Sequence, residues 1–134
     1  MRGLIGRLTA LGRGRHFNRD LGALGERLAV RHLRRRGHRI LETNWTSPRG
    51  EIDIISALDD GTLVFTEVKT RRGVGHGEPL EAVDGAKHAQ VMAVSQDYIR
   101  RWRLERRPVR CDLIGVLLSE DGTDPRIDHV EGVI

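Results

Sequence analysis

The sequence predicts a single α/β domain with elements in the order α-β-β-β-α-β-β, and three observations support it. The chain has 134 residues, the size of one domain with one hydrophobic core. Two segments carry apolar residues at helical spacing. Five further runs have the composition of strands and are separated by turn signals. We expect residues 1–19 to form a basic, flexible arm and residues 20–134 to form the domain.

The first helix is predicted over residues 21–36. Asp20 is a suitable N-cap, and Gly37 is a stop signal. Its apolar stripe consists of Leu21, Leu24, Leu28 and Leu33. Glu26 falls on the inward half of this helix, in the gap between Val30 and Leu33. Its cations lie on the opposite side, at Arg27, Arg31 and Arg34.

Three strands are predicted next, over residues 38–45, 50–58 and 62–71. Asp59 to Gly61 is a turn signal that makes the last two a hairpin. A second helix is predicted from a cap at Asp84 to about Arg103. Its stripe consists of Val91, Val94, Tyr98 and Trp102. Two strands complete the chain, over residues 109–118 after Pro108 and over 126–134.

Several charged residues occupy positions that should face the core. Side chains alternate along a strand, so Glu67 and Lys69 share a face with Phe65, roughly 6.5–7 Å apart. The hairpin brings Asp53 of the preceding strand close to both. Lys87 lies in the first turn of the second helix and projects along its apolar stripe. The sequence therefore directs carboxylates and lysines toward the interior.

Buried charge must be paired or bound to metal. One interpretation is a salt-bridge network that joins Glu67 to Lys69 or Asp53 to Lys87. The other is a divalent cation, and Mg²⁺ suits a few carboxylates with open water positions. A lysine beside such an ion can orient or deprotonate a water, whereas arginine does not give up its proton. The chain has 21 arginines and 2 lysines, so a lysine at residue 69 is consistent with the second interpretation.

The charge distribution indicates a polyanionic partner. The formal net charge is +4, and arginines cluster within residues 2–19, 27–39 and 100–110. Such clusters suit nucleic acid, although for any single cluster a solvated surface is the favoured interpretation. Trp45 and Trp102 could stack on bases, but the small number of aromatic residues in the chain favours core or rim packing for both. A single cysteine excludes an intramolecular disulfide. No signal-peptide core or membrane-length apolar run is visible, so we expect a cytoplasmic protein without a membrane partner.

Four motifs carry a family resemblance. The segments GEIDII (50–55) and VFTEVKTR (64–71) resemble the core of the PD-(D/E)XK nuclease superfamily. Together with GERLAVRHLRRRGHRILETNW (25–45) and AVDGAK (82–87), they resemble the YraN-type family of small uncharacterised bacterial proteins over roughly residues 18–134. The resemblance implies a restriction-endonuclease-like core, with a mixed sheet flanked by helices. One departure is Ile52, which precedes Asp53 where the superfamily has proline.

The resemblance also implies a function and a site. Asp53 and Glu67 would be metal carboxylates, and Lys69 would be the catalytic lysine. Glu26 would match a helix glutamate shared with archaeal Holliday-junction resolvases. The expected activity is Mg²⁺- or Mn²⁺-dependent hydrolysis of phosphodiester bonds in DNA, on branched or single-stranded structures. The residues expected to contact nucleic acid are Lys87, Arg71, Arg13 and Arg15.

Two other interpretations remain open at this point. The first is a non-catalytic nucleic-acid-binding module that keeps the fold, and the second is a structural domain whose arginines form its surface. Resolvase-like relatives act as dimers, so the resemblance also carries the expectation of a homodimer.

Overall fold

The computed structural model describes residues 15–73, 85–121 and 124–133, which form a mixed five-stranded sheet and two helices. The element order is the predicted one: α2 (Arg15–Arg35), β1 (Arg39–Ser47), β2 (Gly50–Ala57), β3 (Leu63–Arg72), α3 (Gly85–Trp102), β4 (Val109–Leu118) and β5 (Arg126–Val130). The strands lie in sequence order across the sheet. Neither helix of these residues is long and apolar enough to cross a membrane.

The pairing of β3 with β4 makes the sheet mixed. These two strands run parallel over ten residue pairs, from Leu63 opposite Val109 to Arg72 opposite Leu118. The other three strand pairs are antiparallel. Gly61 adopts a φ of 93° in the β2–β3 connection, which confirms the predicted hairpin turn. A parallel pair requires a crossover, and α3 lies within that connection.

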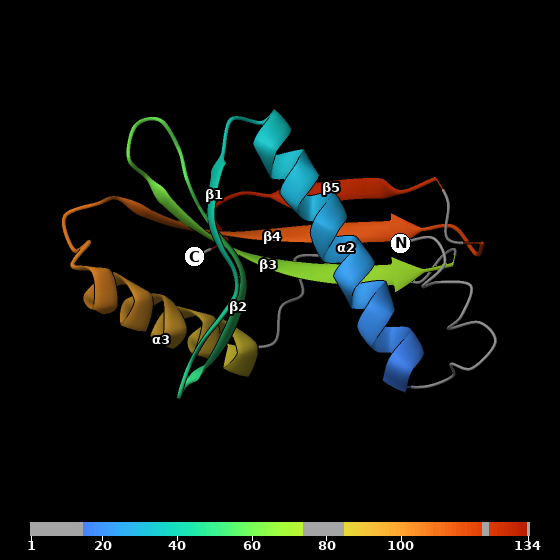
Figure 1. Ribbon diagram of the computed structural model, residues 1–134, viewed down its shortest axis with the longest axis horizontal. Helices are drawn as coiled ribbons and strands as arrows, with labels where there is room; N and C mark the ends of the chain where they lie inside the picture. The colour runs from blue at the N-terminus through green and yellow to red at the C-terminus, as the bar shows by residue number, and fades with distance from the viewer. Residues whose placement is uncertain (1–14, 74–84, 122–123, 134) are drawn as a thin grey trace.

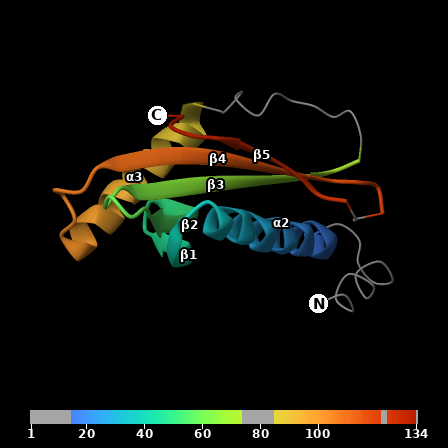
Figure 2. The same cartoon turned by 90° about the horizontal axis from the view of Figure 1, so that it is seen from above.

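The helices pack against opposite faces of the sheet. α2 crosses β3, β4 and β5 on one face, whereas α3 lies beside the bent β1–β2 hairpin (Figures 1 and 2). The core has two corresponding parts. Ala29 and Leu33 of α2 pack with Ile54 and alternate residues of β4. Val91, Val94 and Tyr98 of α3 pack with Ile52 and Phe65. The apolar stripe predicted for the first helix therefore faces the sheet, as do Val91, Val94 and Tyr98 of the stripe predicted for the second. Trp102 was wrongly included in that stripe, because its side chain is 48 % exposed at the end of α3.

The first helix begins earlier than predicted. It starts at Arg15, so Asp20 lies inside it and is not its N-cap. Of the predicted arm, residues 1–14 lie outside the described residues, and residues 15–19 belong to α2. The predicted stop is confirmed, because Gly37 has a φ of 92° and His38 N–H donates to Leu33 O at 3.0 Å. This is the left-handed termination that glycine favours.

A buried polar network joins β4 to β5 on the α2 side of the sheet. The carboxylate of Asp112 is fully buried and accepts hydrogen bonds from Arg110 Nε at 2.9 Å and from His129 Nε2 at 2.8 Å. Gly132 N–H is a third donor, at 3.1 Å. His32 of α2 bonds to the other ring nitrogen of His129 at 3.0 Å. Burial alone raises the pKa of Asp112, but these donors outweigh it and lower the pKa to about 2.

This network predicts an acid-sensitive contribution to stability. The pKa of Asp112 in the folded protein lies below its unfolded value, so its contribution is complete above about pH 4 and disappears toward about pH 2. A shift of this size corresponds to about 2 kcal/mol. Urea unfolding of wild type and Asp112→Asn should therefore show a stability difference that shrinks between pH 4 and pH 2. A difference that stays constant over this range would contradict the assignment.

Candidate functional site

The site forms where the β2–β3 ladder ends. The two strands pair from Ala57 opposite Leu63 to Ile54 opposite Thr66, and the pairing stops there. β2 then stays with β1, where Ile52 lies opposite Trp45. Val68 of β3 therefore has no partner in β2, and its N–H donates instead to Asp53 Oδ2 at 2.8 Å. The Asp53 carboxylate thus accepts the hydrogen bond that a backbone carbonyl of a paired strand would otherwise accept. This bond holds the Asp53 side chain beside β3.

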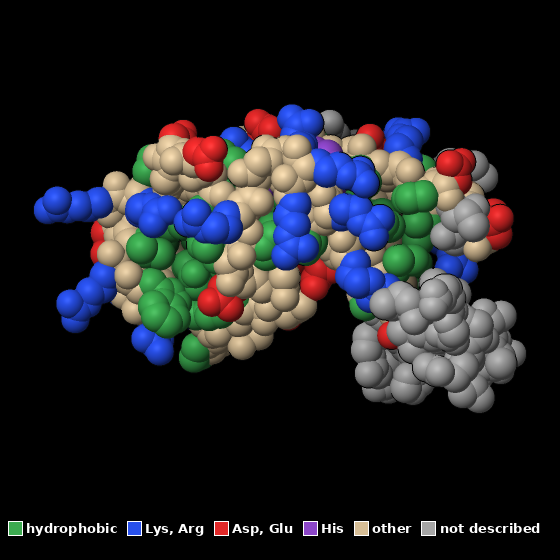
Figure 3. All heavy atoms as spheres, turned by 45° about the horizontal axis from the view of Figure 1, so that its top comes forward, with side chains coloured by type: hydrophobic (Ala, Val, Ile, Leu, Met, Phe, Trp, Pro, Cys, Tyr) green, Lys and Arg blue, Asp and Glu red, His purple; other side chains and the backbone are tan. Residues whose placement is uncertain are grey.

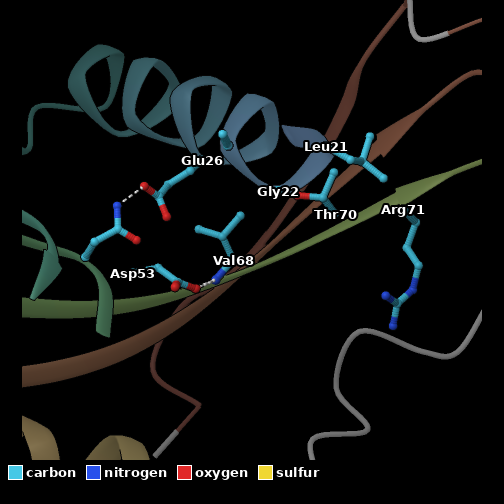
Figure 4. Close-up of a pocket in the computed structure, with 9 residues that line it drawn as sticks. Leu21, Gly22, Glu26, Asp53, Val68, Thr70 and Arg71 are labelled. Atoms are coloured by element: carbon cyan, nitrogen blue, oxygen red, sulfur yellow. Dashed lines mark hydrogen bonds between the residues drawn. The ribbon is translucent and has the colours of Figure 1, made fainter. Parts of the chain in front are cut away.

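A pocket of about 540 Å³ opens beside this carboxylate. It is bounded by α2 on one side and by β3 on the other (Figure 4). Its lining residues are Leu21, Gly22, Ala23, Glu26, Asn44, Asp53, Val68, Thr70 and Arg71. Gly25 lets the helix approach the strand closely, because a Cβ atom there would overlap Thr70 Oγ1. The absence of a side chain at this position brings Glu26 toward Asp53.

Glu26 is held from β1. Asn44 Nδ2 donates to Glu26 Oε1 at 2.6 Å, the dashed bond at the left of Figure 4. Asn44 has a φ of 54°, a left-handed conformation that asparagine adopts more readily than most residues. Burial raises the pKa of Glu26 above its usual value, the bond from Asn44 opposes this, and repulsion from Glu51 adds to it. Asn44 therefore fixes Glu26, the carboxylate of α2 that lines the pocket.

Asp53 is the most perturbed carboxylate of the site. Its pKa is raised to about 7, chiefly by burial, although the hydrogen bond from the Val68 N–H lowers it. Repulsion from Glu67 and Glu26 raises the pKa further, and Lys87 opposes it. Asp53 therefore interacts electrostatically with both of the other predicted carboxylates. A buried carboxyl group next to two others is a common feature of functional sites.

Glu67 and Lys87 form an ion pair on the α3 side of β3. Lys87 Nζ lies 2.8 Å from Glu67 Oε2, and the side chains are 44 % and 13 % exposed. The bond to Glu67 raises the pKa of Lys87 above its usual value. The predicted salt-bridge partners were therefore wrong, since Glu67 pairs with Lys87 and not with Lys69. Lys87 lies in the first turn of α3 as predicted but is not directed into the interior.

Lys69 follows Glu67 by two residues in β3, so it lies on the same face of the strand. It is half-buried, and no hydrogen bond or ion pair engages its amine within the described residues. The acids of the site and this lysine thus come from α2, β2 and β3, with Lys87 added from α3.

The predicted nucleic-acid contacts differ in position. Arg71 is exposed, lines the pocket and extends away from Glu26 and Asp53 (Figure 4). Arg13 lies outside the described residues. Arg15 is the first residue of α2, and its side chain is not among those described. As predicted, Arg27, Arg31 and Arg34 are exposed, whereas Glu26 of the same helix is half-buried.

The carboxylates are near one another but are not grouped as ligands. Within residues 15–73, 85–121 and 124–133, no three His, Cys, Asp or Glu side chains are arranged to hold a metal ion. Each acid has a partner of its own: Asn44 for Glu26, the Val68 N–H for Asp53 and Lys87 for Glu67. Sequence reasoning missed Asn44, and only its position before Trp45 at the end of the 25–45 motif could have drawn attention to it.

Comparisons with known proteins agree with the motifs. The model of the uncharacterised protein family UPF0102 matches residues 25–116. A UPF0102 protein of Renibacterium salmoninarum is 41 % identical over 114 residues, which cover 85 % of this chain and 95 % of the relative. One from Dehalococcoides mccartyi is 40 % identical over 119 residues, covering 88 % and 96 %. One from Trichlorobacter lovleyi is 40 % identical over 123 residues, covering 92 % and 94 %. The chain therefore belongs to the UPF0102 family, the YraN-type family that its motifs predicted.

Proposed function

We propose that this protein is a metal-dependent endonuclease that hydrolyses phosphodiester bonds in DNA. The observation that carries the proposal is the electrostatic interaction of Asp53 with both Glu26 and Glu67 where the β2–β3 ladder ends, with Lys69 two residues after Glu67 on β3. Two of these acids, Glu26 and Asp53, line an open pocket, where carboxylates are suited to bind a cation beside a substrate phosphate.

The donor set fits Mg²⁺ or Mn²⁺. Carboxylate oxygens are hard ligands, and Asp53, Glu67 and Glu26 supply them from three different elements. Their mutual repulsion at Asp53 is the charge imbalance that a divalent cation would offset. The amine of Lys87 now partly offsets it beside Glu67. The cation must therefore compete with Lys87, Asn44 and the Val68 N–H for these oxygens.

Lys69 is the proposed catalytic lysine. A bound divalent cation would lower the pKa of a water and stabilise the charge that develops on the phosphoryl group. In this proposal the amine of Lys69 orients the attacking water or accepts its proton, and the water oxygen forms a bond to phosphorus. The bond from phosphorus to the 3′ oxygen of the sugar breaks, and that oxygen takes a proton from solvent to leave as a hydroxyl. The lack of a partner for Lys69 within the described residues leaves the amine available for this role.

Arginines beside the site would bind the DNA backbone. Arg71 borders the pocket, and Arg27, Arg31 and Arg34 line the exposed side of α2. Such side chains contact phosphates and position a duplex without reading its sequence.

A second candidate function is a nucleic-acid-binding module that does not cut. The ion pair between Lys87 and Glu67 favours it, because this contact neutralises one carboxylate of the site without a metal. The two functions share the binding surfaces and differ only in turnover.

A cleavage panel tests the proposal. Wild type with Mg²⁺ or Mn²⁺ should cut at least one of four DNA substrates: duplex, flap, single strand or four-way junction. EDTA and the variant Asp53→Asn should abolish cutting, because both remove the cation from the site. Isothermal titration should show weaker Mn²⁺ binding by Asp53→Asn. If wild type binds the substrates and cuts none of them, the binding module becomes the better account.

A further inference from the structure

A second surface with polar and aromatic side chains lies at the C-terminal end of α3, away from Glu26, Asp53 and Glu67. Here the β1–β2 turn meets the helix and leaves a groove of about 390 Å³. The groove is lined by Trp45, Thr46, Ser47, Pro48, Arg49, Asp97 and Arg101. Trp102 follows Arg101 as the last residue of α3. We call the groove together with Trp102 the tryptophan surface.

Trp102 presents a large aromatic ring to solvent. It is 48 % exposed, and its ring centroid lies 6.5 Å from that of Tyr98. The guanidinium carbon of Arg101 lies 4.6 Å from the centroid of the Trp102 ring. Tyr98 in turn contacts Trp45 edge-on, at 5.1 Å between centroids. The Trp102 indole thus contacts Tyr98 on the core side, and the Arg101 guanidinium lies over its ring.

The shape of the groove depends on one carboxylate, that of Asp97. Arg49 of the β1–β2 turn donates to both oxygens of Asp97, at 2.6 and 3.1 Å, and to Ala93 O at 3.0 Å. Ser47 Oγ and Arg100 also donate to Asp97, at 2.7 and 2.9 Å. These contacts fasten the turn to α3 and neutralise the only acid that lines the groove within the described residues.

The remaining charge is positive. Residues 97–107 contain five arginines and two acids. Arg101, Arg103 and Arg106 are exposed, and no ion pair engages them within the described part of the chain. Basic side chains protrude from the end of the molecule where α3 stops, at the left of Figure 3. Arg103 adopts a left-handed φ of 56° directly after Trp102, where the helix ends.

We propose that the tryptophan surface binds single-stranded nucleic acid, with an unpaired base stacked on Trp102 and phosphates bound by Arg101, Arg103 and Arg106. Aromatic side chains interleaved with arginine are the combination that binds single strands, because every base has a face that can stack. A duplex stacks its bases internally and offers this indole only its backbone. An acidic peptide would match the arginines but would leave the indole without a stacking partner.

The surface lies apart from the carboxylates along α3. Lys87 and Trp102 are fifteen residues apart in this helix, which corresponds to ~22 Å at a rise of ~1.5 Å per residue. Binding here does not require cleavage, so this inference goes beyond the proposed nuclease function and can hold if that function fails.

The test compares single-stranded and duplex DNA in EDTA, where a metal-dependent reaction is silent. Fluorescence anisotropy with labelled oligothymidylate should show roughly tenfold to hundredfold weaker binding by Trp102→Ala. Affinity for a duplex of equal length should change little. Trp102→Phe should recover much of the loss, because a ring remains. Met92→Ala is the matched control, since Met92 is also exposed on α3, at 39 %.

A second measurement uses the indole itself. In Trp45→Phe the only remaining tryptophan is Trp102, and oligothymidylate should quench its fluorescence, whereas polyglutamate should not. The proposal is overturned if Trp102→Ala binds the single strand like wild type. If Trp102→Ala loses affinity equally for single strand and duplex, the surface binds phosphates alone. If polyglutamate binds and its binding depends on Trp102, the surface binds an acidic protein partner. A failed cleavage panel leaves each of these outcomes unaffected.

Discussion

Lys69→Ala should lower DNA cleavage by at least about a hundredfold, while DNA and Mn²⁺ affinities stay near those of wild type. Proton transfer by a positioned side chain contributes about 10²- to 10⁴-fold to a rate, and this contribution acts only in the transition state. The measurement is a single-turnover cleavage rate on the best substrate of the panel, together with the two binding constants.

Two controls separate the role of this amine from that of positive charge. Lys69→Arg keeps the charge but cannot release a proton, so it should remain defective. Lys87→Ala removes the other lysine and frees Glu67, and we expect it to weaken DNA binding more than turnover. Cleavage at the wild-type rate by Lys69→Ala would remove the catalytic assignment.

Gly25→Ala should destabilise the fold by about 2 kcal/mol or more, whereas Gly22→Ala in the same helix should stabilise it by about 0.5–1 kcal/mol. A Cβ atom at residue 25 would overlap Thr70 Oγ1 and lie 2.9 Å from Thr70 Cβ. At residue 22 it would meet nothing within 4 Å, so only the gain in helix propensity remains. Urea unfolding of both variants measures the contrast.

A second substitution, at Thr70, should relieve the collision that Gly25→Ala creates. Thr70→Ala removes the hydroxyl and the methyl group that collide with the new Cβ, so the double variant should recover part of the stability lost in Gly25→Ala. If Gly25→Ala and Gly22→Ala raise stability alike, α2 does not approach β3 as closely as described.

The order of the elements could be predicted from sequence because each one carries a local signal. Apolar stripes marked both helices, and Gly37 and Gly61 marked a helix end and a hairpin turn. The start of α2 could not be predicted in this way. Residues 15–19 have no apolar stripe, and Asp20 resembles a cap, although the helix continues through it.

The positions of the acids at the site could be predicted in part, but their partners could not. Strand alternation put Glu67 and Lys69 on one face, and two residues on one strand are too far apart for a close ion pair. The partner of Glu67 comes from α3, which only the packing of that helix determines. The same holds for Asn44 and for the Asp112–His129 contact, since both depend on tertiary arrangement.

The parallel pairing of β3 with β4 has a consequence during synthesis. β3 is complete at Arg72, but β4 begins at Val109, so at ~5–20 residues per second the edge of β3 stays open for seconds. Its first four residues, Leu63 to Thr66, are buried in the final fold, and the first three are apolar, which is the type of segment that aggregates when exposed. Its second half carries Glu67, Lys69, Arg71 and Arg72, and charge on an open edge opposes pairing with another chain. We therefore expect Glu67 and Lys69, which are proposed for chemistry, also to oppose aggregation of the nascent chain.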